Sequence, residues 1–416
     1  MSNSKFGFLP AASSILNAPL HEIAADYWNK LSHLGGEVID ETKISEEKPL
    51  AFFILTGGTE RLVLNYIKTR SEYFPNEPIL LLSHANNNSL PASLEILAKL
   101  QQEGRKGKII FMDEESNKDF LDDIEKTISF LNIFHQLKKI KIGLIGNPSD
   151  WLVASSPENE IIKNIWGPEI IKIELKELKE MISQVKDEEV EDAHFVLTKK
   201  ASEIKEPNKK ELKHAVKVYG AIKKIIDKYS LNAVSVRCFD LVLDLKTTGC
   251  FALSKLNDDG IIAGCEGDLV STLGMIWANA ITNQSVWMAN PAQVNKESNT
   301  ILLAHCTVPV GMIQSYKLRS HFESGLGVGI QGEFTKGKVT LFRLGGNKLD
   351  QLWITSGEIL ESTDSENLCR TQVKIKLHGS AKPTDLLEQP LGNHLLMMRG
   401  TYTKEMQNWW EMFIQN

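Results

Sequence analysis

Two different spacings of hydrophobic residues alternate along the first third of the chain. Short apolar runs of strand length alternate with longer segments whose apolar residues recur every three or four positions. The short runs are typical of buried strands and the longer segments of amphipathic helices. We therefore expect strands at residues 5–9, 50–55, 78–83 and 108–112, and helices at residues 21–34, 60–69, 91–102 and 119–137. This order predicts a parallel sheet with helices on both faces.

A second series of the same kind begins near residue 140. It predicts strands at residues 140–145, 170–175, 233–239 and 260–265, with long helices at residues 209–229 and 268–281. After residue 286 the helical spacing fades, and short alternating runs separated by glycine turns take its place. These runs, at residues 300–305, 327–334, 338–344, 351–357 and 369–377, indicate an antiparallel β domain or barrel. A last helix is expected at residues 404–414.

The predicted fold class is therefore α/β: two doubly wound, Rossmann-like domains with parallel sheets, followed by an antiparallel, barrel-like domain. We place an N-terminal α/β domain at residues 1–139 and a second α/β domain, carrying part of the candidate site, at residues 140–285. The β-rich C-terminal domain takes residues 286–416. A chain of 416 residues is long enough to need more than one hydrophobic core.

Composition narrows the possible partners. Hydrophobic residues make up 42% and charged residues 24%, which is typical of a soluble globular protein, and the formal net charge is −6. That charge favours neither a nucleic acid nor an anionic membrane surface as partner. The N-terminus lacks a secretory pattern, and the five cysteines form no C-x-x-C pair, so we expect a cytoplasmic protein with reduced thiols.

Candidate chemistry first appears in the segment Cys265-Glu266-Gly267-Asp268, where a predicted strand meets a predicted helix. Ligands of open α/β sheets gather at the carboxyl ends of the strands. Asp268 can either cap the helix or take part in the chemistry. Glu266 has no evident capping role, so it is the stronger candidate for a functional carboxylate.

Three later residues have comparable positions. The predicted strand at residues 285–289 ends at Asn290, and the next one ends at His305. His394 follows Gly392, which allows the tight turn that aims a side chain inward. One carboxylate, two imidazoles and an amide oxygen would suit Mn²⁺ or another divalent first-row metal. A histidine alone more often serves as an ordinary hydrogen-bonding group, so His305 gains weight only through its companions.

These segments resemble the metal-site motifs of the L-fucose and L-arabinose isomerases. The resemblance rests on the order of Cys265-Glu-Gly-Asp268, Met288-Ala-Asn290, His305-Cys306 and Gly392-Asn-His394, and it covers nearly the whole chain. Further motifs of that family's C-terminal domain begin at His321, Gly337 and Cys369. Residues 88–92 and 146–151 are similar to the shorter, fucose isomerase-like members.

The resemblance implies a metal-dependent aldose–ketose isomerase, an intramolecular oxidoreductase that acts on a free sugar or sugar derivative through an enediol. It makes Glu266 a metal ligand and candidate acid/base, with His305 and His394 as further ligands. The amide oxygen of Asn290 completes the expected ligand set, and Mn²⁺ is the expected metal. It also implies a homo-oligomer, a trimer or hexamer, with a small-molecule sugar as substrate and neither nucleic acid nor membrane as partner.

One departure from the family leaves alternatives open. Asn290 stands where the family's isomerases place a second carboxylate, and an amide cannot take up a proton at neutral pH. Either Asp268 or Glu323 supplies the second acid/base, or the reaction differs, as in an epimerase or a carbon–carbon lyase. A sugar-binding or regulatory protein that lost turnover is the alternative from another class. The candidate substrate-binding residues, each of which could instead form structural ion pairs or hydrogen bonds, are Arg343, Arg370, His321 and Glu323.

Overall fold

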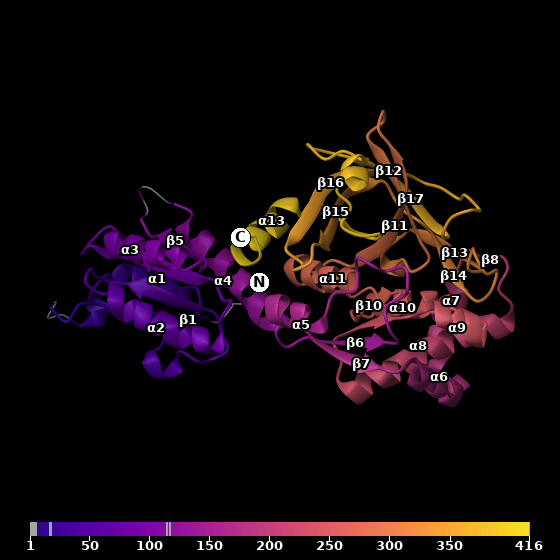
Figure 1. Ribbon diagram of the computed structural model, residues 1–416, viewed down its shortest axis with the longest axis horizontal. Helices are drawn as coiled ribbons and strands as arrows, with labels where there is room; N and C mark the ends of the chain where they lie inside the picture. The colour runs from indigo at the N-terminus through magenta and orange to yellow at the C-terminus, as the bar shows by residue number, and fades with distance from the viewer. Residues whose placement is uncertain (1–5, 16–18, 114, 116–117, 416) are drawn as a thin grey trace. The chain divides into compact units, whose positions relative to one another are not determined.

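The computed structural model describes residues 6–15, 19–113, 115 and 118–415 (Figure 1). The chain forms two compact units, one of residues 1–138 with 407–416 and the other of residues 139–406. The predicted α/β class is confirmed: two parallel sheets precede a closed antiparallel barrel. The division into three domains at residues 139 and 285 stays a prediction.

The first unit is built on a parallel five-stranded sheet in the order β2-β1-β3-β4-β5. Its central strands are buried along their whole length, because helices cover both faces of a parallel sheet. The strands are β1 (Phe6–Ala11), β2 (Gly36–Val38), β3 (Leu50–Ile54), β4 (Ile79–Ser83) and β5 (Gly107–Phe111). The helices are α1 (Ala25–His33), α2 (Glu60–Tyr73), α3 (Ser89–Gln102) and α4 (Phe120–Leu137).

A charged cluster lies inside this unit. Glu77 accepts a hydrogen bond from Nε of Arg70 at 2.5 Å and contacts Nε2 of His135 at 2.7 Å. All three side chains are buried. The last helix, α13 (Thr403–Phe413), brings Phe413 into a stacked contact with Phe134 of α4, with ring centroids 5.6 Å apart. The first unit therefore contains a buried ion-paired cluster in addition to its hydrophobic core.

The second unit begins with a parallel sheet in the order β10-β9-β6-β7. Its strands are β6 (Lys141–Ile145), β7 (Glu169–Ile173), β9 (Ala233–Val236) and β10 (Ile262–Cys265). Its helices are α5 (Asn159–Ile161), α6 (Leu175–Gln184), α7 (Glu191–Lys199), α8 (Lys209–Tyr229), α9 (Phe239–Leu245), α10 (Cys250–Asp258) and α11 (Leu269–Thr282). The strand predicted at residues 233–239 ends three residues earlier, at Val236, and α9 already begins at Phe239.

The same unit closes a six-stranded antiparallel barrel in the order β11-β12-β17-β16-β15-β18. Its strands are β11 (Val286–Asn295), β12 (Thr300–His305), β15 (Gly337–Gly345), β16 (Gln351–Ser362), β17 (Thr371–Leu377) and β18 (Leu395–Arg399). A small three-stranded sheet accompanies it, formed by β8 (Glu203–Ile204), β13 (Ser315–Arg319) and β14 (Gly329–Glu333), and the short helix α12 (Asp385–Glu388) precedes β18.

The predicted end of a strand at Asn290 is wrong. β11 continues to Asn295, and its pairing with β12 shifts register between Pro291 and Gln293. A bulge of this kind lets a strand pass a proline, which has no N–H for the ladder. Asn290 therefore lies inside a strand, opposite Ala304, rather than just past a strand end.

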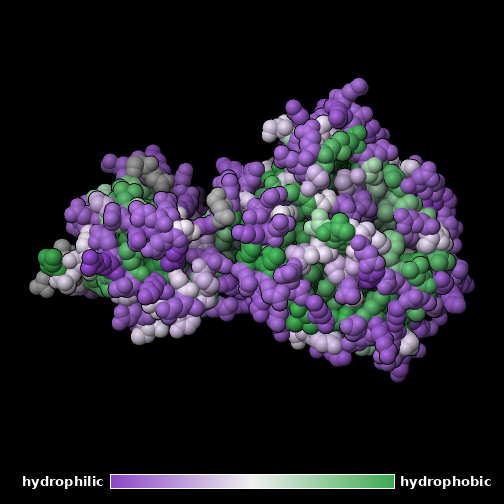
Figure 2. Space-filling view, in the orientation of Figure 1, coloured by the Kyte–Doolittle hydropathy of each residue, from purple (hydrophilic) through white to green (hydrophobic). Residues whose placement is uncertain are grey.

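Hydrophilic side chains dominate the face seen in Figure 2, and apolar residues emerge in separate small groups. Within the described residues, no helix combines the length and the apolar character needed to cross a bilayer.

Candidate metal centre

Three residues that are far apart in the sequence meet in the second unit. Glu266 directly follows β10, His305 ends β12, and His394 directly precedes β18. One potential ligand atom from each lies within 4.8 Å of the other two, and all three side chains are buried. Parallel sheet and barrel therefore contribute to one site, in which the predicted carboxylate and both predicted imidazoles come together.

Both imidazoles turn the same nitrogen toward one carboxylate oxygen. Nε2 of His394 lies 3.5 Å from Oε1 of Glu266, and Nε2 of His305 lies 3.8 Å from the same atom. The two rings meet edge to face, with centroids 5.7 Å apart. These distances are long for hydrogen bonds. They place the two Nε2 atoms and Oε1 of Glu266 around one central position.

The backbone at Glu266 is held in an uncommon conformation. Glu266 has φ of +63° and Gly267 has φ of +70°. The carbonyl of Glu266 accepts a hydrogen bond from the Ser149 N–H at 2.8 Å, and a Cβ on Gly267 would lie 2.8 Å from Cα of Pro148. A left-handed non-glycine residue costs on the order of 1 kcal/mol and persists only where its surroundings fix it. Here it aims the carboxylate at the imidazoles.

Asp268 holds His394 from behind. Its Oδ2 accepts a hydrogen bond from Nδ1 of His394 at 2.8 Å and pairs with Nη1 of Arg343 at 3.3 Å. Its Oδ1 caps α11 by accepting from the Ser271 N–H at 2.7 Å. A Cβ at Gly392 would lie only 2.4 Å from Arg343, so this position needs a glycine. Asp268 is thus both a helix cap and a partner of an imidazole.

The other two members of the site also have fixed partners. Nδ1 of His305 shares a 2.9 Å hydrogen bond with the hydroxyl of Thr307. Oε2 of Glu266 accepts a hydrogen bond from the indole N–H of Trp151 at 2.6 Å, although 49% of Trp151 is exposed. Trp151 therefore holds Oε2 of Glu266, while Oε1 of Glu266 stays directed at the histidines.

Burial raises the pKa of Glu266, but the facing imidazoles of His305 and His394 outweigh it and leave the pKa below its usual range. Burial alone would lower the pKa of His394, yet Asp268 and Glu266 raise it above the ordinary value. The cluster thus holds a carboxylate that stays ionised.

These residues fit a divalent cation. Nε2 of His394 is buried and has no hydrogen-bond partner among the described residues. Because Nδ1 donates its proton to Asp268, the neutral ring would offer the lone pair of Nε2 to a cation, as in the carboxylate–histidine pairs that orient metal ligands. One carboxylate oxygen and two imidazole nitrogens form a mixed set that suits first-row divalent metals.

The remaining candidate residues lie in different surroundings. Asn290 is half-buried on β11, opposite the residue that precedes His305. Arg343 is fully buried and bonded to Asp268, Ser271 and Ser155. His321 is buried with its ring edge-to-face against Phe239, 5.4 Å between centroids, and Glu323 is exposed. Arg370 is buried and bound to Glu366. Their roles in binding substrate stay predictions.

Sequence reasoning assigned no role to Trp151 or Thr307. Trp151 belongs to the segment 146–151 that resembles fucose isomerase-like proteins, but that resemblance does not predict its hydrogen bond to Glu266. Thr307 lies two residues beyond His305, and a hydroxyl at that spacing is too common to draw attention. Both contacts depend on tertiary geometry.

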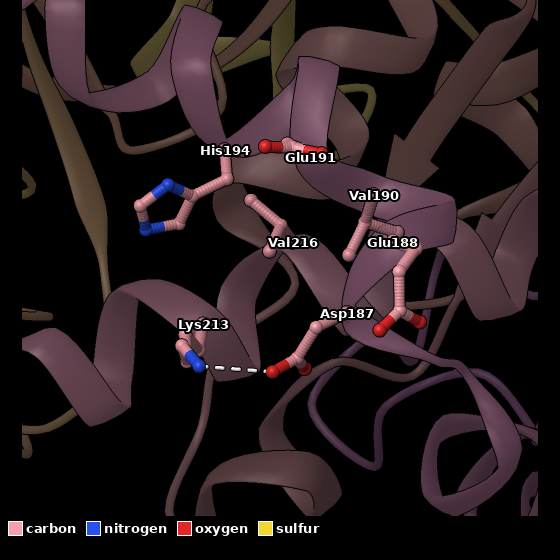
Figure 3. Close-up of a pocket in the computed structure, with 7 residues that line it drawn as sticks. All are labelled: Asp187, Glu188, Val190, Glu191, His194, Lys213 and Val216. Atoms are coloured by element: carbon pink, nitrogen blue, oxygen red, sulfur yellow. Dashed lines mark hydrogen bonds and ion pairs between the residues drawn. The ribbon is translucent and has the colours of Figure 1, made fainter.

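A cavity of about 290 Å³ lies elsewhere in this unit, among η4 (Asp187–Val190), α7 and α8. Figure 3 shows Lys213 directed at Asp187, 2.9 Å away, while the ring of His194 points away from that pair. Lys213 and Lys217 together lower the pKa of Asp187 to about 2. These are contacts of a solvated surface, and the cavity lacks the buried ligand set of the candidate centre.

The fold and the site define an α/β protein with a C-terminal barrel and a buried centre of one carboxylate and two imidazoles. A comparison with models of protein families gives no match. Among curated proteins, the chain is 23% identical over 290 residues to a sulfoquinovose isomerase of Alkalicoccus urumqiensis, which covers 67% of this chain and 64% of that protein.

Two further similar proteins have the same name. The sulfoquinovose isomerase of Priestia aryabhattai is 22% identical over 294 residues, or 68% of this chain and 64% of the relative. That of Clostridium sp. (strain MSTE9) is 25% identical over 188 residues, or 44% and 42%. The similarity thus spans less than two thirds of the length of these relatives.

Proposed function

We propose that this chain is a metal-dependent aldose–ketose isomerase that acts on a free sugar or sugar derivative. The observation that carries the proposal is the convergence of Glu266, His305 and His394, with a buried Nε2 of His394 that has no hydrogen-bond partner. The similarity to proteins named sulfoquinovose isomerase supports the same reaction class.

In this proposal Glu266, His305 and His394 hold the cation, with Mn²⁺ as the expected metal. A divalent cation would polarise the two substrate oxygens and favour the enediol that aldose–ketose exchange requires. Asp268 keeps His394 in the tautomer whose Nε2 can act as a ligand. Asn290 is the proposed fourth ligand, through the carbonyl oxygen of its side chain.

Isomerisation moves one proton between neighbouring carbons, so the site needs a group that takes up and returns it. Glu266 is the proposed acid/base, because its carboxylate faces the centre and stays ionised. By sequence, Asp268 could either cap the helix or act as a second acid/base; its oxygens are bonded to Ser271, His394 and Arg343, which favours a positioning role. Glu323 remains the candidate for a second acid/base.

The substrate class proposed from the relatives' name is a sulfonated sugar. Sulfoquinovose is a glucose whose carbon 6 carries a sulfonate in place of the hydroxyl, so an enzyme for it needs the isomerase centre and a site for a fixed negative charge. We further propose a cytoplasmic homo-oligomer, a trimer or hexamer, which light scattering on the purified protein would test.

The decisive experiment is a sugar panel of pentoses, hexoses, deoxysugars and acidic sugars, with Mn²⁺, Co²⁺ or Mg²⁺ and a chelated control. Wild type should form the ketose from one sugar only with metal present, and Glu266→Gln should lose at least about a thousandfold in rate. Glu361→Gln, on an exposed carboxylate of β16, is the matched control and should retain wild-type rate. Turnover that survives chelation, or in Glu266→Gln, would contradict the proposal.

A second candidate, a sugar-binding or regulatory protein, is favoured by one observation. Asn290 stands where the resembling isomerases have a carboxylate, and it cannot shuttle a proton. This reading predicts metal-dependent sugar binding by calorimetry with no product by NMR in D₂O. Deuterium at the carbon next to the carbonyl would instead favour the isomerase.

A further inference from the structure

Two buried arginines converge on a single oxygen atom in the second unit. Arg319 ends β13 and Arg370 directly precedes β17, and their exposed fractions are 4% and 7%. Nη2 of Arg319 lies 2.8 Å, and Nη1 of Arg370 2.9 Å, from Oε2 of Glu366. Two guanidinium groups on one oxygen make a strong, directional anion site.

The carboxylate that occupies this site, that of Glu366, is far more exposed than the two arginines that bind it. Glu366 lies on the loop between β16 and β17, and its side chain is 61% exposed, against 5% and 8% for those of Arg319 and Arg370. A third cation, Lys205, lies 3.6 Å from its other oxygen. The arginines are therefore fixed in the fold, whereas the carboxylate reaches them from solvent.

The local charges show what would remain without Glu366. Arg319, Arg370 and Lys205 contribute three positive charges, and Glu206, which accepts from Nε of Arg319 at 2.8 Å, contributes one negative charge. Without Glu366, these four side chains carry a net charge of +2. Because buried cations need a nearby anion, a competing anion from solution could take the place of Glu366.

The arginine pair is connected to the candidate metal centre through short links. The Arg370 N–H donates to Sγ of Cys306 at 3.4 Å, and Cys306 follows His305 in the chain. Thr371, the next residue after Arg370, is paired in register with His305. Nε of Arg370 donates to the carbonyl of Ser320 at 2.8 Å. The anion site therefore adjoins the segment that supplies one imidazole.

We propose that Arg319 and Arg370, assisted by Lys205, form the subsite for a tetrahedral oxyanion on the far end of the sugar substrate, and that Glu366 fills this subsite in the free protein. The inference rests on the proposed function and extends it to the end of the sugar that takes no part in the reaction. A guanidinium fork matches sulfonate and phosphate oxygens equally well in geometry. Sulfonate, a monoanion, replaces the single charge of Glu366 without adding another.

The test uses the full chain with three variants. Arg370→Gln removes one arm of the subsite, Glu366→Gln removes the internal competitor, and Glu361→Gln is the control. Glu361 is also a carboxylate near the end of β16, 59% exposed and paired with Lys374 at 3.3 Å. The probes are methanesulfonate for binding, by calorimetry, and sulfoquinovose, glucose 6-phosphate and the uncharged 6-deoxyglucose for turnover.

Glu366→Gln should bind methanesulfonate at least about threefold more tightly than wild type, since the competing carboxylate is gone. Arg370→Gln should lower kcat/KM for sulfoquinovose about 100-fold more than for 6-deoxyglucose. Glu361→Gln should change neither quantity. Preference for glucose 6-phosphate over sulfoquinovose, with the same response to Arg370→Gln, would keep the subsite and assign it to phosphate.

An unchanged methanesulfonate affinity in Glu366→Gln would overturn the proposal and show that Glu366 forms only a structural ion pair with the arginines. This test does not depend on whether Arg370→Gln folds. An equal loss on charged and uncharged sugars in Arg370→Gln would also overturn it. Methanesulfonate binding needs no turnover, so a chain that binds it as expected yet isomerises nothing would refute the proposed function alone.

Discussion

Replacement of Asp268 by asparagine tests how the candidate centre is supported. The carboxylate now accepts the Nδ1 proton of His394 at 2.8 Å. An asparagine that turns its NH₂ toward the ring would donate to Nδ1 and shift the ring proton to Nε2, the atom that faces Glu266. An imidazole protonated at Nε2 cannot bind a cation there, so Asp268→Asn should weaken metal binding while leaving all three ligands in place.

Loss of a group that orients a metal-bound histidine typically costs 10- to 100-fold in metal affinity. We expect that range for Asp268→Asn, equal to about 1.4–2.7 kcal/mol of binding free energy. The metal-free protein should also lose stability, because Arg343 loses its buried anion. Removal of one partner of a buried ion pair costs about 3–5 kcal/mol, and we expect the lower end because Arg343 keeps two serine partners.

The assay is calorimetric titration of metal-free protein with Mn²⁺, with urea unfolding followed by circular dichroism on the same samples. Asp258→Asn is the matched control: Asp258 accepts from the N–H groups of Val310 and Gly311, and among the described residues it has no hydrogen bond to Glu266, His305 or His394. It should lower stability without changing Mn²⁺ affinity. A folded Asp268→Asn protein that binds Mn²⁺ within twofold of wild type would refute the reasoning.

Three further predictions concern other parts of the molecule. Trp151→Phe should weaken Mn²⁺ binding about 5–10-fold through loss of the N–H donor to Glu266. It should also reduce the quenching of tryptophan fluorescence by bound Mn²⁺, whereas Trp353→Phe on β16 should leave the Mn²⁺ affinity as in wild type. Mn²⁺ at a hundredfold excess over its Kd should add about 2.7 kcal/mol of stability and raise the Tm by roughly 5–10 °C, an increase that chelator or Glu266→Gln should abolish. In the first unit, burial raises the pKa of Glu77, but the contacts with His135 and Arg70 outweigh burial and lower the pKa overall. The ionised carboxylate therefore stabilises the fold above pH about 4.3. This stabilisation is lost as the pH falls through the lowered pKa of the folded state. Glu77→Gln should cost about 3–5 kcal/mol at pH 7 and flatten the acid dependence of urea unfolding, and an unchanged acid dependence would contradict this assignment.

The sequence predicted the parallel sheets well because their strands are continuous apolar runs between helices of clear spacing. The helix over residues 209–229 was predicted at its exact bounds, since Asn208 and Glu211 form a capping box at its start. Residues 315–319 and 395–399 were missed as strands. Residues 395–399 of β18 are almost uniformly apolar, which does not separate strand from helix in so short a run.

Part of the candidate site could be predicted in the same way. Glu266, His305 and His394 were identifiable because each follows or precedes a recognisable turn or strand. The bonds that fix them, from Asp268 to His394 and from Trp151 to Glu266, join residues 126 and 115 positions apart. No local pattern encodes such contacts. For the same reason the contact of Arg319 with Glu366, 47 positions away, could be found only in three dimensions.

The central claim is that Glu266, His305 and His394 bind one divalent cation together. Anomalous diffraction from a crystal soaked in Mn²⁺ tests it most directly. We predict a single strong peak bonded to one oxygen of Glu266 and to Nε2 of both histidines, and no such peak in Glu266→Gln. A peak confined to other residues, or histidines turned away from Glu266 in the Mn²⁺-soaked crystal, would contradict the claim.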